Sequence, residues 1–203
     1  MKLFLIFLTT LLFINVSKSP EPVTLRSGDI IFQTTSSMQC KAVQLATHSI
    51  YSHCGIIDKR ESGYYVCEAV QPVKYTPLKE WIEQGEGSHY VVKRLKDADK
   101  VLTADALKCM KQAEEKYKGK DYDAYFGWTD DKIYCSELVW KVYKNCLNIE
   151  VGKPQLLKDF DLSNPVVKKE LEKRYGSKIP YNEQVVSPAT LFNSELLVEV
   201  VKE

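Results

Sequence analysis

The sequence has almost no net charge and no concentration of basic residues. Its 28 lysine and arginine residues are balanced by 27 aspartate and glutamate residues, which leaves a formal net charge of +1. Residues of both signs are interleaved along the chain, as is typical of solvated surfaces. Proteins that bind nucleic acid through phosphate contacts usually carry a basic patch. The composition therefore gives no electrostatic case for a nucleic-acid partner.

The chain also lacks linker-like, repeated and low-complexity segments. Its 9 glycines and 8 prolines are spread over the sequence and do not gather into a flexible stretch. Nothing divides residues 20–203, and this length fits one domain with a hydrophobic core. We therefore expect a single domain over residues 20–203.

Cysteine pairs at zinc-binding spacing are absent as well. An even number of cysteines in an exported chain normally indicates disulfides, although a domain of this size does not need them for stability. None of the cysteines forms a CxxC pair, so the sequence predicts no metal site, and it predicts no organic cofactor. The six cysteines lie at positions 40, 54, 67, 109, 135 and 146.

The first residues form one continuous apolar run. Lys2 precedes residues 3–16, which are apolar except for two threonines and one asparagine, and Ser17 and Ser19 follow. This pattern is typical of a secretory signal peptide, and the run is short for a membrane span. We expect residues 1–19 to be a signal peptide and the mature protein to be exported to the periplasm or another extracytoplasmic compartment, without a stable membrane span. An uncleaved N-terminal anchor is the alternative.

The stretch Ile133–Trp140 predicts a cysteine in the first turn of a helix. A helix N-terminus carries a partial positive charge and free N–H groups. These groups stabilise a thiolate and can receive the oxyanion that forms when it attacks a carbonyl. Cys135 is therefore a candidate nucleophile, and a buried small residue at a helix start is the alternative. The apolar residues that follow it at helical spacing are Leu138, Val139, Val142 and Cys146.

Two strand-like runs flank a polar loop at residues 59–62, which predicts a hairpin. A four-residue loop sets a register in which His53 lies opposite Glu68, and Cys54 lies opposite Cys67. Directly opposed residues share one face of a sheet, with Cβ atoms about 5 Å apart. We therefore expect an imidazole and a carboxylate to meet on one face, and two thiols to meet on the other.

These residues supply the parts of a thiol hydrolase. Cysteine catalysis needs a thiolate, a base that takes its proton and a group that orients the base. Here Cys135 would supply the thiolate, His53 the base and Glu68 the orienting group. Cys146 is a weaker candidate because it lies at the far end of its helix, and Cys54 is weaker because it points away from the face of His53. A packed cysteine beside a structural His–Glu hydrogen bond is the alternative.

Several stretches of the chain carry a resemblance to a known family. They are Leu25–Gln33, Tyr51–Ile56, Glu68–Val73, Phe126–Trp128, Tyr134–Trp140 and Ser187–Ala189. Together they resemble the YiiX/YaeF group of permuted papain-like amidases, which is related to the NlpC-type cell-wall cysteine peptidases and to lecithin retinol acyltransferase. The resemblance implies Cys135 as nucleophile, His53 as base and Glu68 as the orienting residue.

The resemblance also implies the fold. The histidine precedes the cysteine in this chain, which is the permuted order. We expect an α+β, circularly permuted papain-like fold of the NlpC type, with an antiparallel sheet packed against the nucleophile helix. The extra cysteines Cys54 and Cys67 depart from the usual sequence of the group, which leaves the redox state of the sheet open.

The sequence thus predicts an exported cysteine hydrolase that cleaves an amide bond through an acyl-enzyme on Cys135. The substrate would be a peptide, a cell-wall peptide or an amino-acid conjugate. The backbone N–H of Cys135 would hold the oxyanion, with help from Tyr51, Gln33 or Tyr134. The alternatives are a lipid acyl hydrolase or acyltransferase, which a long apolar groove would favour, and a non-catalytic module that binds cell-wall peptides. The sequence leaves the substrate and the oligomeric state open.

Overall fold

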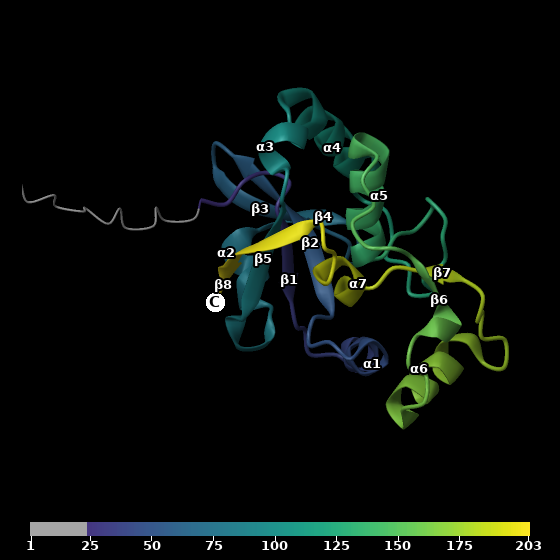
Figure 1. The fold of residues 1–203 in the computed structure, drawn as a ribbon. Helices are drawn as coiled ribbons and strands as arrows, with labels where there is room; N and C mark the ends of the chain where they lie inside the picture. Colours follow the sequence, from purple (N-terminus) through teal and green to yellow (C-terminus); the bar gives the residue numbers. More distant parts are fainter. Residues whose placement is uncertain (1–23) are drawn as a thin grey trace, which may run out of the picture.

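The computed structural model of the protein describes residues 24–203 (Figure 1). The predicted signal peptide at residues 1–19 lies outside the described residues. Within residues 24–203, no helix has the length and the apolar character needed to cross a bilayer.

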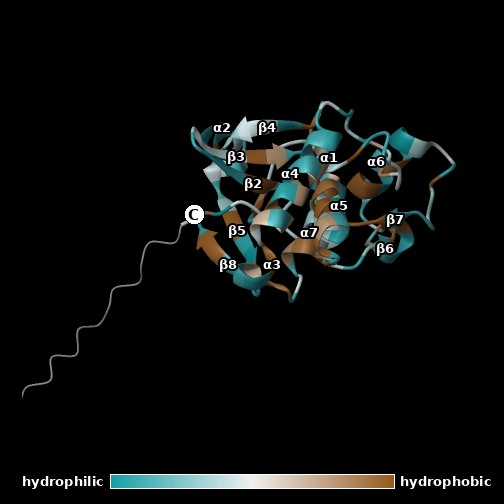
Figure 2. Ribbon diagram, turned by 90° about the horizontal axis from the view of Figure 1, so that it is seen from above, coloured by the Kyte–Doolittle hydropathy of each residue, from teal (hydrophilic) through white to brown (hydrophobic). Residues whose placement is uncertain are grey.

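An antiparallel sheet of six strands forms the centre of the fold, in the order β4-β3-β2-β1-β5-β8. All of β1 and the first five residues of β2 are buried, because elements cover both faces of the sheet there. The strands are β1 (Ile30–Gln33), β2 (His53–Arg60), β3 (Gly63–Glu68), β4 (Lys74–Pro77), β5 (Tyr90–Leu95) and β8 (Leu197–Lys202). Figure 2 shows hydrophobic residues along β2 and β3 and on the neighbouring helix α5.

The helices divide between the two faces of the sheet. Helix α5 (Cys135–Leu147) packs on one face, where its residues share a cluster with Ile30 and Ile56. Helix α2 (Leu78–Glu83) covers part of the other face, where Trp81 packs with Ile31 and Ile57. The alternation of side chains along each strand produces these two cores. The remaining elements are α1 (Met38–Thr47), α3 (Ala98–Val101), α4 (Ala104–Tyr117), α6 (Pro165–Tyr175), α7 (Pro188–Phe192), the short strands β6 (Gln155–Leu156) and β7 (Gln184–Val185), and the 3-10 turns η1 (Glu86–Ser88) and η2 (Leu157–Asp159).

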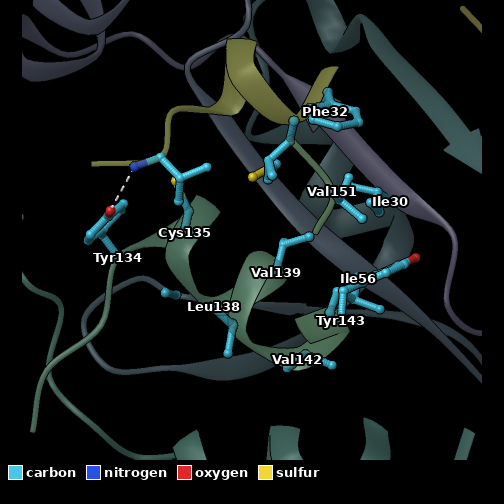
Figure 3. Packing of buried hydrophobic residues seen from close by; sticks show 14 of the residues in the cluster. Ile30, Phe32, Ile56, Tyr134, Cys135, Leu138, Val139, Val142, Tyr143 and Val151 are labelled. Carbon is cyan, nitrogen blue, oxygen red and sulfur yellow. Dashed lines mark hydrogen bonds between the residues drawn. The ribbon is translucent and has the colours of Figure 1, made fainter. Parts of the chain in front are cut away.

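The predicted helix at Cys135 is confirmed, together with its apolar stripe. Leu138, Val139 and Val142 are fully buried, and Figure 3 shows them on the side of α5 that faces the strands. Glu137 accepts a hydrogen bond from the N–H of Tyr134 and so closes the first turn (3.3 Å). This first turn is held in place from outside as well, since the Ser136 hydroxyl donates to the carbonyl of residue 186 (2.8 Å).

The predicted register of the β2–β3 hairpin is wrong by two residues. Arg60 pairs with Gly63 across a two-residue turn, so that Ile56, and not Cys54, lies opposite Cys67. Gly63 adopts a positive φ of 124°, which lets this short turn replace the four-residue loop that we expected. A shift of two residues leaves every side chain on its predicted face, because the pattern of a strand repeats every two residues. Cys54 and Cys67 share a face but are not opposed, and both are free thiols.

A disulfide joins α4 to α5, and sequence reasoning missed it. Cys109 and Cys146 are bonded, with their Cα atoms 5.6 Å apart. Cys146 was expected to pack as part of the apolar stripe of α5. The pairing arises because α4 and α5 lie side by side (Figure 1), and 37 positions separate the two cysteines in the chain. No local sequence pattern predicts a disulfide between two different helices.

Removal of this disulfide should destabilise the fold. A bond that closes a loop of 37 residues restricts the unfolded chain, so the Cys109→Ala/Cys146→Ala variant should lose about 2–4 kcal/mol of unfolding free energy. Urea denaturation measures this loss. A reducing agent should lower the midpoint of the wild-type protein and leave that of the variant unchanged. Equal midpoints for variant and wild type would contradict the bond.

Candidate active site

His53 and Glu68 form a buried hydrogen bond at the centre of the site. The imidazole Nε2 lies 2.6 Å from the Glu68 Oε2, and the two residues are 8% and 0% exposed. The contact that the sequence predicted is therefore present. Thr76 donates to the other carboxylate oxygen (2.5 Å), and the Trp81 indole donates to Oε2 (2.9 Å). Three groups thus fix the position of the carboxylate.

The contact survives the wrong register because of a glycine. Since Ile56 pairs with Cys67, the next position of β2 facing Glu68 is Gly55, and His53 is its diagonal neighbour. Diagonal neighbours on one face remain within reach of long side chains. A Cβ atom on Gly55 would lie 2.4 Å from Val66 Cγ1 and 2.7 Å from the Cys67 carbonyl oxygen. Only glycine fits here, and it leaves room for Glu68 to extend toward the imidazole.

The environment of His53 favours the imidazolium. Burial alone lowers the pKa of the ring, but hydrogen bonds with Cys135 and Glu68, and the charges of both, raise it to about 10. The Trp81 ring stacks on the imidazole, with the centroids 5.8 Å apart. For Glu68, burial raises the pKa, but the hydrogen bond and the charge of His53 outweigh it and bring the pKa below its usual range.

Cys135 begins α5 and is 4% exposed. The pKa of Cys135 lies well below the usual value of a thiol. The largest cause is a hydrogen bond from the Cys54 thiol. Burial opposes the shift, whereas the hydrogen bond and the charge of His53 support it. The backbone N–H of Cys54 contributes a further hydrogen bond in the same direction. These shifts favour a thiolate on Cys135 and an imidazolium on His53, and His53 is hydrogen-bonded to Glu68.

The expectation that Cys54 points away from the face of His53 is confirmed. Successive strand residues do face opposite ways, and Cys54 faces α5 while His53 faces Trp81. Cys135 lies at the beginning of α5, which packs on β2, and both residues influence the pKa of its thiol there. The alternation of the strand was predicted correctly, but the position of the helix end relative to it was not.

A largely apolar cavity of about 120 Å³ leads to Cys135 and His53. Its walls come from segments far apart in the chain, among them α1, the loop before α5, η2, α6 and β7. The apolar residues that line it are Ala42, Val43, Ala46, Phe126, Leu157, Phe160, Leu162, Val167, Leu171, Val185, Val186 and Pro188. Figure 1 shows α1 and α6 next to each other on this side of the molecule.

A few polar groups interrupt the apolar wall. Arg174 donates to the Gln39 side-chain oxygen (3.1 Å), and the Gln39 amide donates to the Tyr122 hydroxyl (3.0 Å). The Arg174 guanidinium also lies over the Phe126 ring, 4.6 Å from its centroid. Hydrogen bonds thus join Arg174, Gln39 and Tyr122 along one side of the wall.

This geometry agrees with the relatives of the chain. Residues 24–201 match the family described as "Permuted papain-like amidase enzyme, YaeF/YiiX, C92 family". The chain belongs to this family. It is 51% identical over 178 residues to the uncharacterized protein YiiX of Escherichia coli K12, and the match covers 88% of this chain and 87% of that protein.

A solved structure shows the same fold. It is reported as the crystal structure of metalloprotein yiiX from Escherichia coli O157:H7, and it is 52% identical with a TM-score of 0.84. The match covers 88% of this chain and 97% of that one. The predicted permuted papain-like α+β fold is therefore confirmed, and the family is one of cysteine peptidases and amidases.

Of the three residues that we expected near the oxyanion, only Tyr134 lies at the cavity. Tyr134 lines the cavity, and its hydroxyl accepts a hydrogen bond from the N–H of residue 186 (3.1 Å; Figure 3). Tyr51 instead stacks on Phe192, with ring centroids 4.2 Å apart. Gln33 is fully buried on the face of Trp81, and its amide has no hydrogen-bond partner among the described residues. Neither Tyr51 nor Gln33 lines the cavity.

No site residue was predicted beyond Leu147, although that segment contributes to the cavity wall. Leu157, Leu171 and Val186 from that segment all line the cavity. Their spacing in the chain is irregular because they come from η2, α6 and the residues after β7. An apolar residue that faces a cavity and one that fills a core look the same in a sequence.

Cys135 should react as a thiolate well below neutral pH. Iodoacetamide should label it at pH 6 at least about tenfold faster than Cys40, because the thiolate is the form of cysteine that reacts. Mass spectrometry of the labelled peptides measures both rates in one sample. His53→Ala should slow the labelling of Cys135 and leave that of Cys40 unchanged. Equal labelling of the two cysteines would contradict the ion pair.

Replacement of Glu68 should have a graded effect on the thiolate. Glu68→Gln keeps an acceptor oxygen but loses the charge that stabilises the imidazolium, so labelling of Cys135 at pH 6 should slow. Glu68→Ala should slow it further, and His53→Ala should slow it most. Glu68→Ala should also cost about 1–3 kcal/mol of stability, because it leaves the buried donors Thr76 and Trp81 unpaired.

Thr76→Val is the matched control for this series, since it removes one hydrogen bond to the same carboxylate and leaves the contact with His53 in place. Thermal melting separates loss of fold from loss of the thiolate. Wild-type labelling in Glu68→Ala would show that another group orients His53.

Proposed function

We propose that Cys135 is the nucleophile, His53 the acid–base group and Glu68 the orienting residue of an amide hydrolase. The observation that carries the proposal is the buried chain of thiolate, imidazolium and carboxylate. A buried cysteine and histidine with purely structural roles would not need their pKa values moved apart in this way.

The reaction follows from these positions. The Cys135 thiolate attacks the amide carbonyl carbon, and the negative charge moves to the carbonyl oxygen. As the first residue of α5, Cys135 has a backbone N–H without an intrahelical acceptor, and this group receives the oxyanion. The imidazolium of His53 then gives its proton to the leaving nitrogen, and the C–N bond breaks. A water molecule that loses a proton to His53 hydrolyses the thioester, and the free acid departs.

The cavity favours a substrate with an apolar acyl chain. Groups that bind peptides or free amino acids would have to be polar, whereas most of this wall consists of aliphatic and aromatic side chains. The cavity therefore resembles the apolar groove expected for a lipid-like substrate more than the polar pocket expected for a peptide. We infer an amide whose acyl group is a hydrocarbon chain, and the same cavity would also accept the corresponding ester of a lipid.

The disulfide supports an exported protein. Such bonds form and persist in oxidising compartments and are rare in the cytosol, and Cys109 is bonded to Cys146. This agrees with the signal-like pattern of residues 1–19 and with a periplasmic or other extracytoplasmic location.

No step of the proposed reaction passes through a metal ion. The related structure from Escherichia coli O157:H7 is named a metalloprotein. In this chain, residues 24–203 hold no group of three or more histidine, cysteine, aspartate or glutamate side chains placed to ligate a metal. One nitrogen of His53, Nε2, is engaged by Glu68.

The length of the acyl chain should control the rate. For reporter amides that carry acetyl, octanoyl or dodecanoyl groups, kcat/KM should rise roughly threefold to fourfold per methylene until the cavity is filled, since each buried methylene contributes about 0.8 kcal/mol. Release of the fluorescent amine measures the rate. Cys135→Ala should abolish it.

Ala46→Trp should lower the rate for the longest chain and spare acetyl, because Ala46 lines the cavity. Ala104→Trp is the matched control, since Ala104 is exposed at the start of α4, outside the cavity. A rate that is independent of chain length, or highest for acetyl, would overturn the apolar substrate and leave the amide hydrolysis standing.

A further inference from the structure

Arg174 is an arginine in the cavity wall that forms no ion pair among the described residues. The sequence holds four arginines, and the other three are each paired with an aspartate at 2.5–2.7 Å. Arg174 is half-buried on α6 and lines the cavity that leads to Cys135. A cation beside an apolar wall is costly unless an anion or several hydrogen bonds compensate it. The cavity therefore presents a positive charge without a counterion in the described part of the chain.

The partners that Arg174 does have are neutral. Its Nη2 donates to the Gln39 side-chain oxygen (3.1 Å), and the Gln39 amide donates to the Tyr122 hydroxyl (3.0 Å). The guanidinium carbon lies 4.6 Å from the centroid of the Phe126 ring. An amide oxygen and a ring face orient a guanidinium but do not neutralise it. Since a guanidinium has five N–H donors, most of them are available to a ligand.

The Phe126 ring connects Arg174 to the nucleophile segment. Phe126 has a φ of 52°, in the left-handed region that a large side chain rarely adopts and that is found at ligand-binding sites. Its ring packs edge-on against the ring of Tyr134, with the centroids 5.2 Å apart, and Tyr134 directly precedes Cys135. A single aromatic ring thus lies between Arg174 and the residue before the nucleophile.

Arg174 and Gln39 lie where the cavity meets the surface. Both line the cavity, and both also line an adjoining hollow on the outside, together with Met38, Tyr125 and Lys173. An anionic group that binds at this boundary keeps part of its hydration, whereas the apolar wall farther inside would exclude it. A hydrocarbon chain and an anion can therefore occupy different parts of one site.

We propose that Arg174 is a specificity-determining residue that binds an anionic group on the amine part of the substrate. The inference rests on the proposed function, in which the acyl chain lies against the apolar wall and the scissile carbonyl lies at Cys135. The amine part then extends toward the mouth, where Arg174 presents its free donors. A guanidinium binds a carboxylate or a phosphate through two parallel hydrogen bonds. The substrate class is thus a fatty acyl amide of an amine that carries a carboxylate or a phosphate.

One carboxylate shares this part of the wall. Glu170 lies one turn before Arg174 on α6 and also lines the cavity, but none of its oxygens lies within 4.0 Å of an Arg174 nitrogen. Its negative charge opposes an anionic ligand. Removal of that charge should therefore strengthen the binding of an anion, which provides a test of the sign of the interaction.

The test is ligand binding to Cys135→Ala, in which no hydrolysis can occur. Calorimetry at neutral pH compares three amides with the same acyl chain: the neutral N-octanoylethanolamine, N-octanoylglycine with its carboxylate, and N-octanoyl-O-phosphoethanolamine with its phosphate. At least one anionic amide should bind about tenfold more tightly than the neutral one, as expected for hydrogen bonds to a charged group. The anion that binds more tightly identifies the source of the charge.

Arg174→Met in the same background should remove this preference and leave the affinity for the neutral amide within about twofold. Arg174→Lys should keep part of the preference, since lysine retains the charge but not the planar fork. Glu170→Gln should increase it. Lys169→Met is the matched control, because it removes a charge from an exposed position of α6 outside the cavity and the hollow, and it should leave the preference unchanged.

The outcomes separate this inference from the proposed function. Equal binding of the three amides, or a preference that Arg174→Met leaves in place, would overturn the role of Arg174 alone. The same holds if Lys169→Met removes the preference equally, or if Arg174→Met weakens neutral and anionic amides to the same extent, which a purely structural role would produce. Failure of all three amides to bind would overturn the apolar acyl site and the role of Arg174 together.

Discussion

The chemistry of this enzyme depends on the packing of the first turn of α5 against the beginning of β2. That contact places the Cys135 sulfur among His53, Cys54 and the helix dipole at once. An isolated thiolate or imidazolium in such a buried place would be expensive, whereas the pair is tolerated because each charge offsets the other and both are hydrogen-bonded. The hydrogen bond of Ser136 to the segment before α7 holds the helix start where this balance exists.

Much of this centre follows from local sequence, and the parts that do not follow depend on packing between distant segments. The helical stripe after Cys135 and the two faces of the hairpin are periodic patterns, so the sequence alone shows them. The hairpin register was wrong because Gly63 permits a shorter turn, yet the contact of His53 with Glu68 was predicted correctly because the shift was even. The Cys109–Cys146 bond depends on how helices pack, for which no short-range pattern exists.

The substrate-facing part of the molecule was the least predictable, and the reason is physical. Chemistry at a nucleophile needs particular residue types, which stand out in a sequence. A cavity that holds a hydrocarbon chain needs only apolar side chains of suitable shape, and those are the residues that also build the core. Leu157 and Leu171 therefore resembled ordinary core positions until the fold placed them around Cys135.

The two parts of the site are anchored independently. The orientation of His53 comes from Glu68, which is held by Thr76 of β4 and Trp81 of α2 on the sheet face away from α5. The cavity wall comes mainly from α1, α6 and the connections around η2 and β7. Changes in the wall would therefore alter the shape of the cavity without moving the carboxylate, the imidazole or the thiol. In the proposed reaction, substrate preference and the orientation of His53 depend on different elements of the fold.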